Sequence, residues 1–215
     1  MVGFSMSNEP LPYAHEYRVS YVGIGGAITE QGATNANWFA WWLSGLGWTK
    51  NAICAALGNW EVETLLNPNY PQSAGFPETQ TGGFGMPHWT PWFKKIGKWA
   101  FDTYGIVGTA TDDNPLADFK LQMEYHEYEC VFGYNGGKTW YNNGGYSYQW
   151  NEWKKSTDDV EELARAYYWQ YERSGAGNPG DRPERARKWF DYFTENPYPS
   201  RLAIPIWLLF KFRKR

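Results

Sequence analysis

A run of small and apolar residues between Thr49 and Glu63 constrains the fold of this chain more than any other feature. It reads Thr-Lys-Asn-Ala-Ile-Cys-Ala-Ala-Leu-Gly-Asn-Trp-Glu-Val-Glu. A helix that is apolar nearly all round is buried on most sides, so we expect this one inside a compact domain. Thr49 suits the N-cap position. The helix has to end before Asn67-Pro68, because a residue that precedes proline avoids the helical conformation.

Other helical patterns and two irregular segments surround this run. Thr34 or Asn35 is expected to cap a preceding helix. The segments 69–91 and 131–150 are rich in glycine and asparagine, and the first has room for a short hairpin. Long irregular segments inside a compact domain are usually functional. Many helices with one irregular or short β lobe predict an α+β fold that is mainly α. The later helices are expected at residues 92–104, 115–130, 156–173 and 181–194.

The composition limits both the size of the core and the kind of partner. With 215 residues and 42% hydrophobic residues, the chain can bury one sizeable core. Aromatic residues reach 20%, including 14 Trp and 16 Tyr. Such rings fill interiors, and a minority could stack on the flat faces of sugars. The net charge of −3 gives no basic field for nucleic acid.

Glu63 is the residue best placed for acid catalysis. Cleavage of a glycosidic bond needs a carboxylic acid whose pKa is raised by an apolar environment, so that it holds a proton. Glu63 lies near the end of the apolar helix, with Trp60, Leu65 and Leu66 nearby, and we expect these neighbours to supply that environment. Glu61 is expected to point elsewhere, because residues two apart on a helix do not share a face.

Other chemistries lack the residues that they require. His15, His88 and His126 form no zinc-binding motif, and no glycine-rich loop has the spacing of a phosphate-binding loop. We therefore expect neither a metal nor a cofactor. Cys54 lies in the apolar helix, a poor setting for a nucleophilic thiolate. Cys54 and Cys130 are expected to be buried, reduced thiols, with one disulfide as the alternative.

Three separated motifs carry a resemblance to a known family. Gly58-Asn59-Trp60-Glu61-Val62-Glu63 is followed by Asn67-Pro68, Gly83-Phe84-Gly85-Met86 by Trp89-Thr90-Pro91, and Tyr171-Glu172-Arg173 by a turn at 178–182. In this order they resemble the phage tail lysozyme family, over about residues 33–194. The resemblance implies a two-lobed, lysozyme-like fold in which Glu63 protonates the oxygen between N-acetylmuramic acid and N-acetylglucosamine.

The resemblance also implies residues beside Glu63. His88 stands where the family has Gln, so it is a candidate hydrogen-bond donor to sugar or backbone that titrates near neutral pH; an ordinary loop residue is the alternative. Glu78 is the candidate second carboxylate, one that orients water, with an exposed loop residue as the alternative. Phe84, Gly85, Trp89 and Tyr171 complete the candidate substrate-binding set, and core packing is the competing interpretation of the aromatic ones. Glu172 matches the family motif too, but we expect a structural ion pair there.

The predicted organisation is an extension (1–33), a lysozyme-like catalytic domain (34–195) and an apolar, basic tail (196–215). No secretory signal or transmembrane run is visible. The resemblance implies an enzyme carried in a phage tail that opens the host cell wall during genome entry. Residues 199–215 are expected to attach it to a tail tube or knob protein, with membrane contact as the alternative. A lytic transglycosylase, a catalytically idle tail component and a free endolysin are the competing functions.

Overall fold

The structure, a computed structural model, describes residues 30–69, 77, 81–109, 114–133, 138–172 and 177–198. This part is mainly helical, and β structure within it is limited to two isolated bridges, Phe84 with Trp89 and Asn143 with Tyr146. The expected mainly-α class is confirmed, whereas the described residues form no β lobe. The helices are α1 (Glu30–Gly45), α2 (Lys50–Thr64), α3 (Ile96–Tyr104), α4 (Phe119–Phe132), α5 (Trp150–Trp153), α6 (Val160–Tyr167) and α7 (Arg182–Glu195), with 3₁₀ turns η1 (Trp92–Lys94) and η2 (Pro115–Ala117) and a π-helical turn η3 (Tyr168–Glu172).

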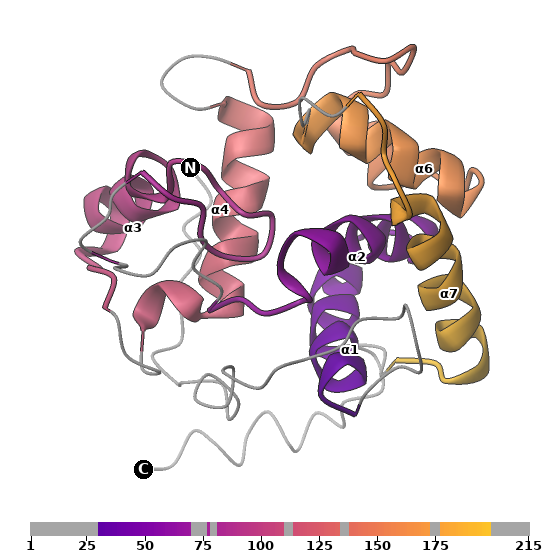
Figure 1. The fold of residues 1–215 in the computed structure, drawn as a ribbon, viewed down its shortest axis with the longest axis horizontal. Helices are drawn as coiled ribbons and strands as arrows, with labels where there is room; N and C mark the ends of the chain where they lie inside the picture. Colours follow the sequence, from indigo (N-terminus) through magenta and orange to yellow (C-terminus); the bar gives the residue numbers. More distant parts are fainter. Residues whose placement is uncertain are drawn as a thin grey trace.

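Helix α4 separates two hydrophobic cores (Figure 1). Leu121 and Tyr125 on one side of α4 belong to the smaller core, which also contains α3 and the segment around Phe84. Phe119 and Met123 on its other side belong to the larger core, which is built from α1, α2, α6 and α7. A helix with apolar residues on two faces is buried on both, so α4 is the element that joins the two halves of the molecule.

Helix α2 is the centre of the larger core, as the sequence predicts. Every residue from Ala52 to Glu61 is buried, and the helix packs against α1, α6 and α7. The Thr49 side chain accepts a hydrogen bond from the Ala52 N–H at 3.2 Å, which confirms the predicted N-cap. Cys54 and Cys130 are buried free thiols, so the expected disulfide-free state is confirmed.

The start of α1 differs from the prediction. The helix begins at Glu30, ahead of the expected caps Thr34 and Asn35. Asn35 is inside the helix, and its side-chain amide donates to the Leu66 carbonyl at 2.9 Å instead of capping α1. A hydrogen bond between a side chain and a carbonyl far away in the sequence cannot be recognised from local sequence, which explains why Asn35 was wrongly predicted as a cap. Residues 1–29 of the predicted extension (1–33) and residues 199–215 of the predicted tail (196–215) lie outside the described residues, and the last four residues of the predicted extension belong to α1.

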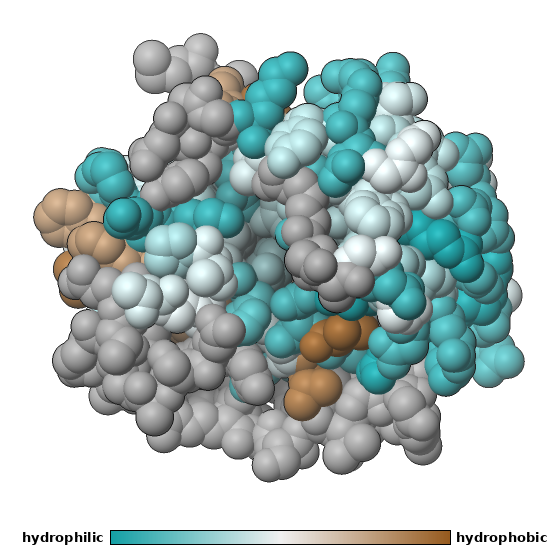
Figure 2. All heavy atoms as spheres, turned by 45° about the horizontal axis from the view of Figure 1, so that its top comes forward, coloured by the Kyte–Doolittle hydropathy of each residue, from teal (hydrophilic) through white to brown (hydrophobic). Residues whose placement is uncertain are grey.

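Polar and charged side chains cover most of the described part of the face drawn in Figure 2, and apolar side chains appear there only in small patches. None of the helices in the described ranges is both long enough and apolar enough to cross a bilayer. The apolar residues of the described part are therefore mostly used in its own two cores.

Helices α2 and α7 make the most extensive contact in the fold, and Gly58 sets how closely they approach. A Cβ atom at Gly58 would lie 2.5 Å from the Ala186 nitrogen and 2.6 Å from the Arg182 carbonyl oxygen. Both are backbone atoms, which cannot turn aside as the end of a side chain can. Glycine at this position therefore lets the start of α7 lie against the second half of α2.

We expect Gly58→Ala to destabilise the protein although alanine is the better helix former. The methyl group overlaps the α7 backbone, and overpacking of this kind costs about 1–3 kcal/mol. The free energy of unfolding, measured by urea denaturation, should fall accordingly. Glu184→Ala, at an exposed position of α7, is the control and should change it little. A Gly58→Ala protein as stable as the wild type would show that the two helices are not in close contact here.

Candidate active site

Glu63 lies in the last turn of α2, at an unusual helix end. Leu65 and Leu66 follow with φ angles of 56° and 58°, in the left-handed region that favours glycine. The Leu65 N–H donates to the Glu61 carbonyl at 3.0 Å, and the Leu66 carbonyl accepts from Asn35. These bonds hold a strained turn. Directly before it, the Glu63 side chain keeps 21% of its surface exposed.

Arg182 joins Glu63 to a second carboxylate. It is the first residue of α7, and its Nη2 donates to Glu63 Oε1 while its Nε donates to Glu172 Oε2 at 2.9 Å. Its Nη1 donates to the Pro179 carbonyl, and the guanidinium lies over the Tyr168 ring, 5.1 Å from the centroid. The guanidinium thus holds the end of α2, the π-helical turn η3 and the start of α7 together.

His88 approaches Glu63 from the other side. Its Nδ1 lies 3.5 Å from Glu63 Oε2, and its φ angle of 55° is again left-handed. Gly83 makes room for the ring, since a Cβ there would lie 2.7 Å from His88 Cδ2. The structure thus brings Glu63 and the 82–91 segment together. The expected sugar contact of His88 stays a prediction.

Two buried side chains fix the turn that carries His88. The Thr64 hydroxyl donates to the Met86 carbonyl at 3.0 Å, and Gln122 Oε1 accepts from the Met86 N–H at 2.9 Å. The same Gln122 amide donates to the Pro68 carbonyl at 2.6 Å and to the Leu116 carbonyl at 2.8 Å. One side chain of α4 therefore ties this turn to the segment that follows α2.

The electrostatic environment of Glu63 is the opposite of the expected one. Burial raises the pKa of Glu63, but the hydrogen bond from His88 and the positive charge of Arg182 outweigh it, so the pKa lies below its ordinary value. The expected apolar neighbours do not determine the pKa of Glu63, because Trp60 and Leu66 are fully buried in the larger core. The contacts with Arg182 and His88 therefore favour the ionised form of the Glu63 carboxyl group.

The pKa of Glu172 is shifted in the opposite direction, upwards. Its side chain is only 5% exposed. Burial raises the pKa of Glu172 well above the ordinary value against the opposing charge of Arg182, and the charge of Glu63 adds to the rise. The contact expected at Glu172 is found, and its partner is Arg182.

The aromatic candidates for sugar binding are interior residues. Phe84 and Trp89 are 0% and 1% exposed and belong to the smaller core, and Tyr171 is 6% exposed in the larger one. Gly85 is buried too, with a φ of 79° in the turn and the Trp89 ring against its Cα. A ring with no exposed face cannot stack on a sugar, so the assignment of these residues to substrate contact is corrected to packing. Glu78, the candidate second carboxylate, lies outside the described residues.

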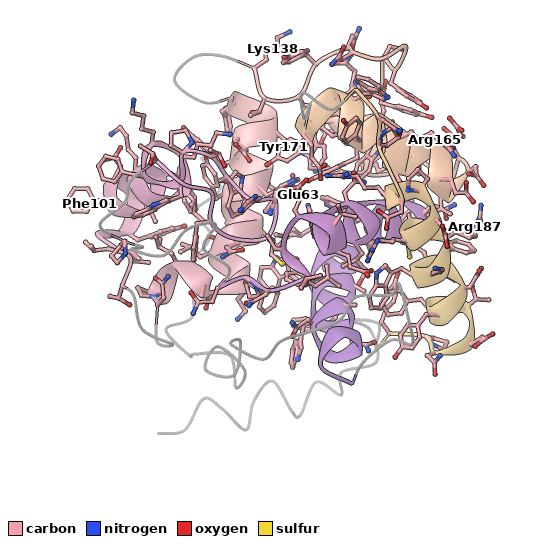
Figure 3. All side chains as sticks on the ribbon, in the orientation of Figure 1. Glu63, Phe101, Lys138, Arg165, Tyr171 and Arg187 are labelled. Carbon is pink, nitrogen blue, oxygen red and sulfur yellow. The ribbon has the colours of Figure 1, made fainter. Side chains whose placement is uncertain are left out.

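A buried carboxyl group, Glu129 of α4, connects two of these rings. The Trp89 indole N–H and the Tyr171 hydroxyl both donate to Glu129 Oε1, and Trp89 also donates to the Tyr171 oxygen at 2.9 Å. Burial raises the pKa of Glu129, although the charge of Lys95 and these hydrogen bonds oppose the rise. Figure 3 places Tyr171 and Glu63 in the middle of the molecule, where the two halves meet. Glu129 thus links Trp89, which follows the turn of His88, to Tyr171 in the turn η3.

The family model that matches this chain is that of the phage tail lysozymes, and the match extends over residues 34–193. The chain belongs to the phage tail lysozyme family. It is also 31% identical over 160 residues to "Morphogenesis protein 1" of Bacillus phage B103, an alignment that covers 74% of this chain and 39% of that protein. The chain therefore corresponds to well under half of that relative's length.

The role of Arg182 was not predicted from the sequence. A cation at the first position of a helix opposes the helix dipole, and that local signal could have drawn attention to it. The buried acids Glu129 and Glu172 carry no such signal.

Within the described ranges, no three His, Cys, Asp or Glu side chains are grouped so that they could hold a metal ion.

The Glu129 carboxyl predicts a pH dependence of stability. A carboxyl whose pKa is raised by folding stabilises the protein fully below its unfolded pKa of about 4.3, and this contribution is lost as the pH rises through the folded pKa. The wild type should therefore lose about 1.4 kcal/mol per pH unit in that window relative to Glu129→Gln, which stays neutral. Urea denaturation of both proteins at pH 5 and pH 8 measures this difference. Parallel stability curves would mean that Glu129 is not protonated on folding.

Proposed function

We propose that this phage tail lysozyme hydrolyses the bond between N-acetylmuramic acid and N-acetylglucosamine in peptidoglycan, with Glu63 as the general acid. One observation carries the assignment. Of the four carboxylates gathered around α2 and η3, the side chains of Glu61, Glu172 and Glu129 are 0%, 5% and 0% exposed, while that of Glu63 is 21% exposed. A general acid has to come within hydrogen-bond distance of the leaving oxygen, and Glu63 is the member of this group that solvent reaches.

The surroundings of Glu63 fit the positioning that such a reaction needs. Arg182 fixes one carboxylate oxygen and leaves the other towards His88. The left-handed turn after α2 and the Thr64 and Gln122 hydrogen bonds hold the two sides of the site in place. A catalytic group held on a rigid helix end needs little reorganisation when the substrate binds. Because its surroundings favour the ionised form, Glu63 has to take up a proton before it can act as an acid.

Glu63→Gln should abolish the lysis of purified cell walls. Glutamine still accepts the hydrogen bond from Arg182 but supplies no proton, and the loss of one general acid should cost at least ~100-fold in rate. Turbidity loss of a wall suspension is the measurement, with circular dichroism to establish that the variant is folded. Glu184→Gln, an exposed carboxylate on α7, is the matched control. Lysis at the wild-type rate by folded Glu63→Gln would refute the assignment.

Mass spectrometry of the wild-type digest separates the two chemistries open to a single glutamic acid. Products with a reducing muramic acid support hydrolysis, and an anhydromuramic acid product identifies a lytic transglycosylase. The absence of any product from a folded wild type would favour a non-catalytic tail component.

We further propose that the enzyme is part of the phage particle and attaches through residues 199–215 to another tail protein. The family, and the morphogenesis protein to which the chain is similar, support a phage structural setting. The segment combines Leu202, Ile204, Ile206 and Leu208 to Phe210 with a basic cluster at 211–215, a composition that suits burial against a partner surface. Deletion of 199–215 should leave wall lysis intact and prevent recovery of the protein in purified particles. Normal incorporation of the truncated chain would contradict the attachment role.

A further inference from the structure

One guanidinium serves two carboxyl groups in this site. Arg182 contacts Glu63 through Nη2 and Glu172 through Nε, so the two acids lie on adjacent edges of the same planar group. The Arg182 and Glu172 side chains are 10% and 5% exposed. Arginine stays protonated under all ordinary conditions, so the cluster has one fixed positive charge and two titratable negative ones.

The charges of this cluster balance with one proton. With both acids ionised, the group would carry one negative charge in excess, and a buried excess charge is costly. With one acid protonated, the other is paired with Arg182 and the group is neutral. Two arrangements meet this condition, one with the proton on Glu172 and one with the proton on Glu63. Strong coupling of this kind makes the titration a property of the pair.

We propose that Glu172 is a positioning residue which shares a single proton with Glu63 across Arg182. When Glu172 holds the proton, Arg182 pairs with ionised Glu63, and this arrangement is favoured because Glu172 is the more buried of the two acids. When Glu172 releases its proton and Glu63 takes one up, Arg182 pairs with Glu172, and the total charge is unchanged. Glu172 thus makes the protonated form of Glu63 accessible at neutral pH. The catalytic consequence rests on the proposed function of Glu63, whereas the proton sharing does not.

Other charged and titratable groups face this cluster and have to be separated from the effect. His88 contacts Glu63 from the 83–90 turn, and Asp181 interacts with Arg182 from the start of α7. Tyr167 of α6 interacts with Glu172. His88 is the important one, because an imidazolium beside Glu63 would also alter its titration. The experiment is therefore also carried out with His88→Gln, which removes the imidazole.

The decisive measurement is the titration of the glutamate side-chain carboxyl carbons in the full chain by ¹³C NMR. The Glu63 and Glu172 signals are assigned by their loss in Glu63→Gln and Glu172→Gln. In the wild type, we expect the Glu63 signal to titrate in two steps, because the two acids share the first proton: a partial step that coincides with the titration of Glu172, and a main step at lower pH. In Glu172→Gln the partial step should disappear, in both the wild-type and the His88→Gln backgrounds. Glu184→Gln should leave both steps unchanged. A wild-type Glu63 signal without the upper step, or one that keeps it in folded Glu172→Gln, would overturn the proposal.

The reciprocal variant tests the same coupling without relying on Glu172→Gln to fold. In Glu63→Gln, Arg182 contacts Glu172 alone, and the negative charge that opposes the ionisation of Glu172 is gone. The pKa of Glu172 should therefore fall by at least about 1 unit. A Glu172 titration that is the same in Glu63→Gln as in the wild type would also overturn the proposal. Both titrations can be read whether or not the protein lyses walls.

Activity gives the corresponding kinetic readout. Because an acid catalyst has to be protonated, the rate falls as the pH rises through the pKa of Glu63. In Glu172→Gln this alkaline limb of kcat/KM should move to lower pH by at least about 1 unit, without a large change in KM at low pH. A uniform loss of rate at every pH would indicate a structural role and would contradict the proposal. If the NMR shifts occur but no wall is cleaved, the proton sharing stands and the proposed function fails.

Discussion

The contact of Arg182 with two carboxyl groups is the interaction on which the arrangement of the site depends. A positive charge at the first position of α7 is unfavourable with respect to the helix dipole, and the nearby acids Glu63 and Glu172 offset that cost. The three groups come from the end of α2, the π-helical turn and the start of α7. Close packing of α2 on α7 at Gly58 brings Arg182 within hydrogen-bond distance of Glu63. The electrostatics of the site therefore depend on how the core is packed.

Local sequence was enough to predict α2 and the position of Glu63, but not the start of α1 or the environment of Glu63. The predicted cap at Thr49, the burial of α2 and its end before Pro68 follow from neighbouring residues, and the structure confirms them. The pairing of Glu63 with Arg182 joins positions 119 residues apart. No periodicity within a helix contains that information, so an apolar setting was expected where the fold supplies two basic side chains.

The aromatic residues reveal a second limit of sequence interpretation. Phe84, Trp89 and Tyr171 fit a sugar-binding groove and a hydrophobic core equally well, because both environments use flat apolar rings. The structure places them in the cores, and the Trp89 and Tyr171 polar atoms are satisfied by the buried Glu129. An acid on the inner side of α4 looks like any solvated glutamate in the sequence. Its burial becomes visible only when α4 is seen to have a core on either side.

The three left-handed residues Leu65, Leu66 and His88 have a consequence for how this site can change. Each non-glycine residue in that conformation costs roughly 1–2 kcal/mol, and glycine would relieve it. Glycine would also give the unfolded chain more freedom, which lowers stability by about 0.4–1 kcal/mol per residue. The second effect offsets about half of the first, and at Leu66 glycine would also lose the side chain that is buried in the larger core. At position 88, the exchange would also remove the ring that touches Glu63.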